Sequence, residues 1–200
     1  MSDNVSKKVA SGLDVCVFYS FLFILLVAAD QFIKKIIVDK ISFAGQIDVI
    51  EGFFSLYHVR NTGSAFSLFA DKPWGIYFLT GISVVMGIVI FVLMIIASRH
   101  KMKLLALAFC LLSSGAVGNL IDRIRLKYVV DYLRFDFGSY TFPIFNFADI
   151  CAVVGTILLI GIILLASGYF ESFWNIIFKK KVKAESEIVA EEKETEENAE

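Results

Sequence analysis

The chain has 200 residues, of which 58% are hydrophobic and 14% aromatic, and its mean hydropathy is +0.73. Soluble domains are nearer half apolar, so this composition indicates a membrane protein. The 19 Lys and Arg residues nearly cancel the 20 Asp and Glu residues, which argues against nucleic-acid binding through bulk positive charge. The three cysteines lie in separate apolar runs and the two histidines lie far apart. We therefore expect neither a disulfide framework nor a metal site.

Four stretches approach the length of about 20 apolar residues that a helix needs to cross a bilayer. They run over Val15–Ala29, Trp74–Ala97, Leu104–Ile121 and Ile150–Phe170. The first stretch extends past Asp14 and Asp30, and no convincing small-residue cleavage site follows it, so we interpret it as a retained span and not as a signal peptide. The sequence predicts an all-α membrane protein with four transmembrane helices.

Lys and Arg residues gather on one side of these spans. They occur at Lys7 and Lys8, in the turn Arg99–Lys103, and at residues 179–183. The excess of Lys and Arg in cytoplasmic loops predicts that this side, with both termini, is cytoplasmic. The two long loops, at about 30–73 and 122–147, then face outward.

The end of the chain differs from the rest in composition. Ala184–Glu200 holds eight Glu residues and no aromatic residue, so it cannot bury enough apolar surface to offset the entropy lost on ordering. We therefore divide the chain into a cytoplasmic N-terminus (1–12), a transmembrane domain (13–170) and a basic, then acidic, disordered cytoplasmic tail (171–200).

Two segments of the long loops resemble strands more than helices. Gln46–Ile50 and Arg134–Phe137 alternate polar and apolar residues before the turn-forming Gly52 and Gly138. This alternation predicts short strands at the membrane surface.

The polar residues that need an explanation all lie on the outer side. Asp30 and Lys34 share one face of the first helix and form either an interfacial ion pair or part of a site. The stretch that begins at Asn61 is either a plain turn or a loop that approaches an extended peptide. Asn119 and Arg123 share a face of the third helix, where Arg123 either anchors lipid headgroups or orients a carboxylate or carbonyl group.

Asp131 and Asp149 are the strongest candidates for chemistry. Asp131 lies within an apolar frame that would desolvate its carboxylate, although an ion pair with Arg123, Arg125 or Arg134 is an alternative. Asp149 follows a helix cap at Asn146, and a capping role alone would also explain it. Two carboxylates in one partly dry site can share a proton, as an aspartic peptidase requires. Proton-coupled transport and a noncatalytic scaffold are the alternatives, and the lack of mid-span polar groups disfavours transport.

Five short strings, in order along four spans, resemble the bacterial lipoprotein signal peptidases, also called signal peptidase II. The strings are DQFIKK at Asp30, NTGSAF at Asn61, GNLIDR at Gly118, VVDY ending at Tyr132 and FNFAD ending at Asp149. The resemblance covers about residues 13–170. Ser64, where the family often has Ala, and Ile150–Cys151 after the second aspartate depart from it.

The resemblance implies an aspartic endopeptidase of the bacterial cytoplasmic (inner) membrane that needs no cofactor. It would remove signal peptides from lipoprotein precursors just before the cysteine that carries diacylglycerol. Asp131 and Asp149 match the family's catalytic pair, and further residues match its site lining: Asp30, Lys34, Asn61, Gly63, Asn119, Arg123 and Asn146, with Ala65 and Phe66 beside Gly63. The family also implies a small outer β-cradle, a mobile element over the substrate and inhibition by globomycin, a cyclic lipopeptide. We expect membrane lipids as neighbours and a monomeric chain.

Overall fold

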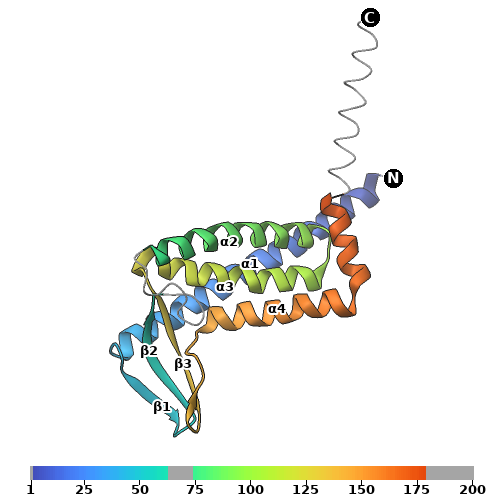
Figure 1. Ribbon diagram of the computed structural model, residues 1–200. Coiled ribbons are helices and arrows are strands. Elements are labelled where there is room, and N and C mark those ends of the chain that lie inside the picture. The colour runs from blue at the N-terminus through green and yellow to red at the C-terminus, as the bar shows by residue number, and fades with distance from the viewer. Residues whose placement is uncertain (1, 63–73, 179–200) are drawn as a thin grey trace, which may run out of the picture. The chain divides into compact units, whose positions relative to one another are not determined.

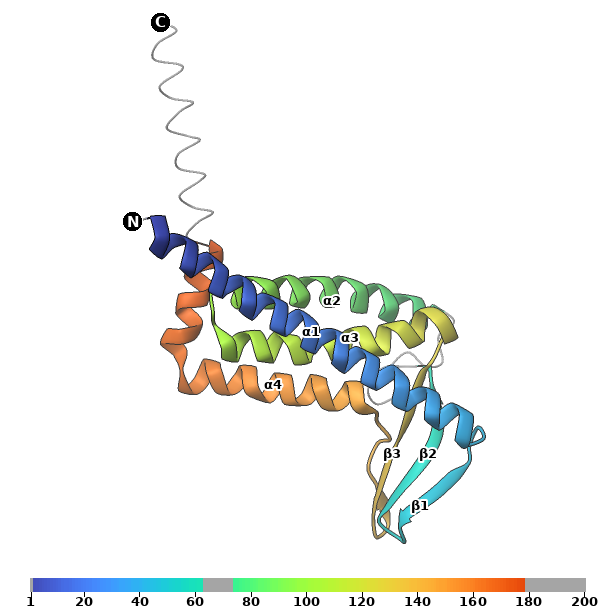
Figure 2. The same ribbon diagram turned by 180° about the vertical axis from the view of Figure 1, so that it is seen from behind.

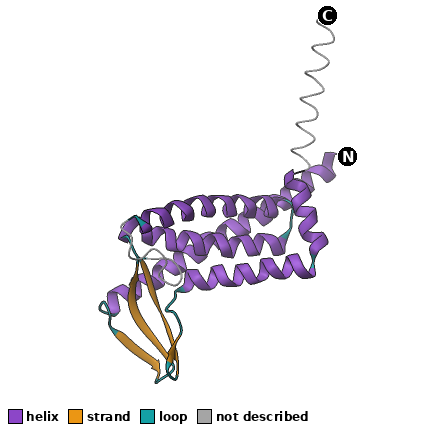
Figure 3. Ribbon diagram, viewed as in Figure 1, coloured by secondary structure: helices purple, strands orange, loops and turns teal. Residues whose placement is uncertain are grey.

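The computed structural model describes residues 2–62 and 74–178 (Figure 1). Its elements in chain order are α1 (Ser2–Lys40), β1 (Gln46–Ile50), β2 (Phe54–Asn61), α2 (Gly75–Arg99), α3 (Lys103–Leu126), β3 (Val129–Phe137), β4 (Tyr140–Thr141) and α4 (Phe147–Leu165). A further helical stretch covers residues 167–178. The chain divides into two compact units, Met1–Leu159 and Ile160–Glu200. The described residues are mostly helical and include one small sheet (Figure 3).

Four helices are long and apolar enough to cross a membrane, as the sequence predicts. They cover Gly12–Lys40, Tyr77–Arg99, Lys103–Leu126 and Phe147–Leu165. Large apolar side chains on them are exposed, among them Phe21, Val85 and Ile157. Exposure of this kind fits helices whose solvent is lipid, so the chain is a multi-pass membrane protein.

Two helices are longer than the apolar stretches that predicted them. α1 continues past Asp30 to Lys40, and α3 continues to Leu126. Charged residues do not end α1 because Asp30 and Lys34, one turn apart, neutralise each other at 2.9 Å. The segments between helices are therefore shorter than the predicted loops.

The fourth span ends earlier than predicted. α4 stops at Leu165 and not at Phe170, and Ala166 separates it from the helical residues 167–178. Ser167 and Gly168, at this break, are weak helix formers. Residues 171–178, which we assigned to the disordered tail, are helical. Residues 179–200 lie outside the described part of the chain.

α3 is the most buried of the four spans, and Figures 1 and 2 show it beside α1 and α2. Glycines allow this close packing. A Cβ atom on Gly115 would overlap the carbonyl oxygen of Ala148 in α4 and lie 3.0 Å from the nitrogen of Ala152. A Cβ atom on Gly118 would lie 2.6 Å from Oδ2 of Asp30. The start of α4 and the turn of α1 that contains Asp30 therefore approach the same turns of α3.

The sheet is antiparallel in the order β1-β2-β3-β4. The predicted strand Gln46–Ile50 is confirmed as β1. The predicted strand Arg134–Phe137 is the second half of β3, which begins at Val129, pairs with β2 as far as Phe135 and pairs with β4 at its last two residues. Residues 129–132 were not predicted as a strand, because all four are buried. Their sequence therefore lacks the alternation of polar and apolar residues that marks a strand with one exposed face.

The sheet is attached to the helices through a small apolar core. Ile37 and Ile41, at the end of α1, pack with Val130 and Tyr132 of β3. Alternate residues of a strand face opposite sides, so Asp131 points away from this core. The sheet lies at the end of α1–α3 where α1 and α3 finish (Figure 2).

Candidate active site

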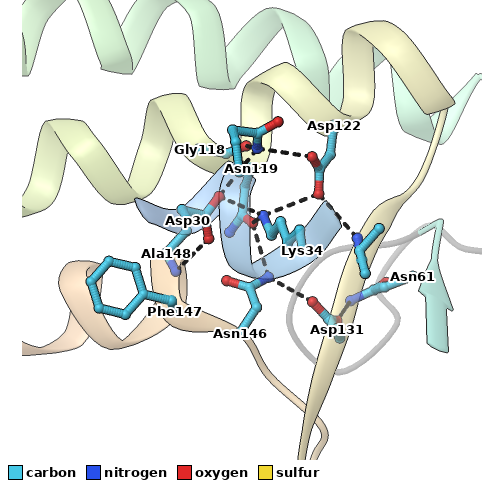
Figure 4. A network of polar contacts seen from close by, with 12 residues as sticks. Asp30, Lys34, Asn61, Gly118, Asn119, Asp122, Asp131, Asn146, Phe147 and Ala148 are labelled. Atoms are coloured by element: carbon cyan, nitrogen blue, oxygen red, sulfur yellow. Dashed lines mark hydrogen bonds and ion pairs between the residues drawn. The ribbon is translucent and has the colours of Figure 1, made fainter. Parts of the chain in front are cut away.

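Polar side chains from α1, β2, α3 and β3 meet next to the start of α4, where the sheet joins the helices (Figure 4). Asp131 comes from β3 and Asp149 from the first turn of α4. Asn61 ends β2, Asn119 lies on α3, and Asp30 and Lys34 lie on α1. Asn146 immediately precedes α4. Residues far apart in the sequence therefore form one network.

Asp131 is buried and is bound by two amides. Its Oδ2 accepts a hydrogen bond from Nδ2 of Asn61 at 2.9 Å, and its Oδ1 accepts one from Nδ2 of Asn146 at 2.7 Å. Its side chain makes no ion pair with any described residue. Arg134, one of the arginines considered as a partner, binds Asp136 instead at 3.0 Å. The apolar frame thus desolvates Asp131 without a directly bound cation.

Asp149 combines a cap with a contact to the site. Its Oδ2 accepts a hydrogen bond from the backbone N–H of Asn146 at 3.0 Å, and its own N–H donates to Oδ1 of Asn146 at 3.0 Å. This reciprocal pair is a capping box, so the predicted cap is confirmed. The other oxygen, Oδ1, accepts a hydrogen bond from Nδ2 of Asn119 at 2.8 Å. The cap therefore orients the carboxylate toward the network.

Two amide groups connect the aspartates. Nδ2 of Asn146 donates to Oδ1 of Asn119 at 3.0 Å as well as to Asp131. Asn119 in turn donates to Asp149. Burial, and secondarily the negative charge of Asp149, raises the pKa of Asp131 to about 6. The two carboxylates are therefore electrostatically coupled, as two groups that share one proton must be.

Lys34 binds two carboxylates other than Asp131 and Asp149. Its Nζ is 2.9 Å from Oδ2 of Asp30 and 3.0 Å from Oδ2 of Asp122, and all three side chains are almost completely buried. Nζ also donates to Oδ1 of Asn119 at 2.9 Å. A buried ion cluster of this kind is costly to break, because removing one partner leaves a charge without compensation. Among the described residues, Asn119 is the one side chain that hydrogen-bonds both to Lys34 and to Asp149.

The two carboxylates on Lys34 also hold the backbone beside each aspartate. Asp122 Oδ2 accepts a hydrogen bond from the N–H of Val130 at 3.1 Å, and Asp30 Oδ1 accepts one from the N–H of Ala148 at 3.0 Å. Val130 and Ala148 immediately precede Asp131 and Asp149. One lysine therefore links the two backbone segments that carry the site.

Asp122 and Gln31 also belong to this network, although they are not among the predicted site residues. Nε2 of Gln31 donates to Oδ1 of Asp122 at 3.0 Å and to the carbonyl oxygen of Gly118 at 3.1 Å. A signal for Asp122 was present, since it lies three residues after Asn119 and so on the same helix face. The prediction used the four-residue spacing between Asn119 and Arg123 and did not consider Asp122.

Of the remaining predicted site residues, the structure describes Arg123 alone. Arg123 is half-buried and close enough to Asp149 and Asp131 to interact electrostatically, but no described residue bonds its side chain. Gly63, Ala65 and Phe66 lie outside the described residues. Within residues 2–62 and 74–178, no group of three His, Cys, Asp or Glu side chains is arranged to hold a metal ion.

Comparison with known proteins identifies the family. The family model described as Signal peptidase (SPase) II matches residues 22–165. The lipoprotein signal peptidase of Clostridium tetani is 38% identical over 149 residues, which are 74% of this chain and 93% of that protein. The chain belongs to the signal peptidase II family. It is therefore a peptidase, and the resemblance inferred from the five strings is confirmed.

Further relatives agree with this membership in signal peptidase II. The lipoprotein signal peptidase of Serratia marcescens is 41% identical over 142 residues, covering 70% of this chain and 81% of that protein. A bacterial membrane enzyme solved by the in meso method at 2.3 Å resolution aligns with a TM-score of 0.61 and 30% identity, covering 80% of this chain and 89% of that one. Because the chain belongs to a peptidase family, the comparisons favour the peptidase over the transporter and scaffold alternatives.

Proposed function

We propose that this signal peptidase II cleaves signal peptides from diacylglyceryl-modified prolipoproteins, just before the lipidated cysteine, with Asp131 and Asp149 as an aspartic dyad. The observation that carries the proposal is that two carboxylates from separate elements are bound by neutral amides and coupled to each other. The names of the relatives, lipoprotein signal peptidases, support the substrate class.

In this mechanism the dyad holds one proton. The ionised carboxylate accepts a proton from water as the water attacks the scissile carbonyl carbon, and the protonated partner donates to the developing oxyanion and then to the leaving amine. The raised pKa of Asp131 supports retention of a proton close to neutral pH. Asn61, Asn119 and Asn146 orient the two carboxylates through N–H groups without adding a full positive charge.

Arg123 has a different role in the proposal. It lies near both aspartates, and no described residue uses its guanidinium. A free guanidinium can orient a peptide carbonyl group through paired N–H donors. We assign Arg123 to substrate binding, together with the loop of Gly63.

The proposal includes a topology. Both termini, with residues 1–12 and the tail, are cytoplasmic, and the sheet is the outer β-cradle of the domain at 13–170. The dyad then acts at the outer surface of the bacterial inner membrane, at the depth where a lipidated cysteine is held by its acyl chains. Each buried CH₂ group of those chains contributes about 0.8 kcal/mol to binding. The same site would bind globomycin-type cyclic lipopeptides, and a monomer suffices for this chemistry.

The deciding experiment is a gel-shift cleavage assay in detergent. The substrates are one precursor lipoprotein with and without diacylglycerol on its cysteine, and the enzymes are wild type, Asp131→Asn and Asp136→Asn. Asp136 lies on the same strand and binds Arg134, away from the dyad. We expect wild type and Asp136→Asn to cleave only the lipidated precursor, and turnover by folded Asp131→Asn to fall at least a thousandfold, because one member of the proton-sharing pair is lost. Substantial cleavage by Asp131→Asn would refute the dyad.

A further inference from the structure

Arg60, near the end of β2, lies over two aromatic rings. Its Cζ is 4.7 Å from the centre of the Phe43 ring and 5.0 Å from the centre of the Tyr128 ring. Among the described residues no carboxylate pairs with it and no acceptor bonds its side chain. Stacking restrains a planar guanidinium through its face and leaves the N–H groups at its edge available. Arg60 is therefore oriented by the rings while its hydrogen-bonding capacity is unused.

A second cation nearby is held in a similar way. Lys127 directly precedes Tyr128, and its Nζ lies 5.8 Å from the centre of the Tyr77 ring. It makes no ion pair with a described residue. Lys35 and Arg134, by contrast, form ion pairs with Asp39 and Asp136. We call Arg60, Lys127, Phe43, Tyr77 and Tyr128 the Arg60 cluster.

The Arg60 cluster lies at the level where three spans end. The span of α1 ends at Lys40, three residues before Phe43, and the span of α2 begins at Tyr77. The span of α3 ends at Leu126, immediately before Lys127. Figures 1 and 2 show these helix ends together beside the sheet. Residues directly beyond the apolar part of a span lie at the depth of the lipid headgroups.

We propose that Arg60, restrained by the rings of Phe43 and Tyr128, binds the phosphate of a phospholipid headgroup, with Lys127 adding a second positive charge. The guanidinium edge matches two phosphate oxygens in geometry and charge. This lipid site lies across the sheet from the dyad, because Arg60 and Asn61 are consecutive in β2 and point to opposite faces. Asn61 bonds Asp131, so the lipid binds the other face of the strand end that carries a site residue. The proposal concerns lipid binding alone and does not depend on prolipoprotein cleavage.

The test measures phospholipid retention by native mass spectrometry of the full chain in detergent, titrated with phosphatidylglycerol. The variants are Arg60→Gln and the control Arg125→Gln, which removes the same charge from an exposed residue in the last turn of α3 that has no ring contact among described residues. We expect Arg60→Gln to weaken binding of the first lipid about tenfold and Arg125→Gln to change it less than twofold. Phe43→Leu, which keeps every charge, should weaken it severalfold because the guanidinium loses one of its rings.

Three results would overturn the proposal. Equal losses in Arg60→Gln and Arg125→Gln would mean diffuse attraction by surface charge. Unchanged retention in Arg60→Gln would mean that Arg60 binds no lipid. Displacement of the lipid by millimolar inorganic phosphate would identify a free-phosphate site. If circular dichroism shows that Arg60→Gln does not fold, Arg60→Lys replaces it, and this variant should lose most of the binding because lysine keeps the charge without the planar fork.

Discussion

The four carboxylates of the site have two kinds of partner. Asp131 and Asp149 accept hydrogen bonds from neutral amides, while the cation of Lys34 is bound directly by Asp30 and Asp122. A directly bound cation would lower the pKa of a catalytic carboxyl group strongly. Because the amide of Asn119 lies between Lys34 and Asp149, burial and carboxylate repulsion outweigh the attraction of the cation at Asp131.

The raised pKa of Asp131 predicts a pH-dependent stability. An unfolded carboxyl group releases its proton near pH 3.8, whereas folded Asp131 retains it to about pH 6. Between these values the folded chain binds more protons than the unfolded chain, so the free energy of unfolding falls as the pH rises, by at most about 3 kcal/mol. The apparent thermal midpoint of wild type in detergent, measured relative to Asp131→Asn, should therefore decrease from pH 4 to pH 6 and level off above pH 7.

Asp149→Asn is the matched variant for this titration. It removes the second cause of the raised pKa and leaves burial unchanged, so the decrease should shift to lower pH. If the difference in thermal midpoint between wild type and Asp131→Asn stayed constant across pH 4–7, the pKa of Asp131 would not be raised by folding.

At the scale of elements, the start of α4 is held by several neighbours. The N–H of Phe147 donates to the Tyr132 hydroxyl at 3.2 Å, that of Ala148 to Asp30, and that of Asp149 to Asn146. These are the first N–H groups of the helix, which have no partners within the helix itself. Strand β3 and helix α1 thus complete the hydrogen bonding of α4 and place Asp149.

Gly115 of α3 tests the importance of this placement. In Gly115→Ala the new methyl group would overlap the carbonyl oxygen of Ala148, one residue before Asp149. We expect the start of α4 to shift, turnover to fall at least tenfold, and the free energy of unfolding to decrease by about 1–3 kcal/mol. Cleavage assays and thermal unfolding in detergent measure these changes.

Gly81→Ala in α2 is the control, because no atom of a described residue outside its own stretch of helix lies within 4 Å of the added Cβ. Alanine favours a helix over glycine by about 1 kcal/mol, so this variant should match wild type in turnover and equal or exceed it in thermal midpoint. Wild-type behaviour of Gly115→Ala would show that α3 and α4 can separate without cost to the site.

At the scale of the whole molecule, the bilayer acts as the solvent of the spans. Exposed apolar side chains on α1, α2 and the first part of α4 contrast with the buried charges at the ends of α1 and α3. The ionisable groups of the site lie near one end of the helices, which suits chemistry at a membrane surface and not a path through the membrane.

The proposed topology predicts which turns a membrane-impermeant maleimide reaches. Ser139→Cys is in the exposed turn between β3 and β4, and His100→Cys is in the exposed turn between α2 and α3. In a Cys16→Ser background, where the remaining Cys110 and Cys151 are buried, intact cells should label only Ser139→Cys. Permeabilised cells should label both variants. Labelling of His100→Cys in intact cells would reverse the orientation.

The sequence alone was sufficient to predict features that depend on residues close together in the chain. The four spans follow from the length and apolarity of local stretches, and β1 follows from its alternation. The Asp30–Lys34 pair and the cap of α4 follow from spacings of four and three residues within one helix or its first turn. Such features depend on the local backbone period, which the order of residues states directly.

Only the tertiary structure decided how these parts combine. β3 begins at Val129 because it pairs with β2, and Asp131 finds Asn61 across 70 positions of sequence. Lys34 binds both Asp30 and Asp122. These two carboxylates bind the backbone of Ala148 and Val130, so the contacts connect α1, α3, α4 and β3. No local period marks these partners, because each contact forms only when separate elements pack and desolvate the groups between them.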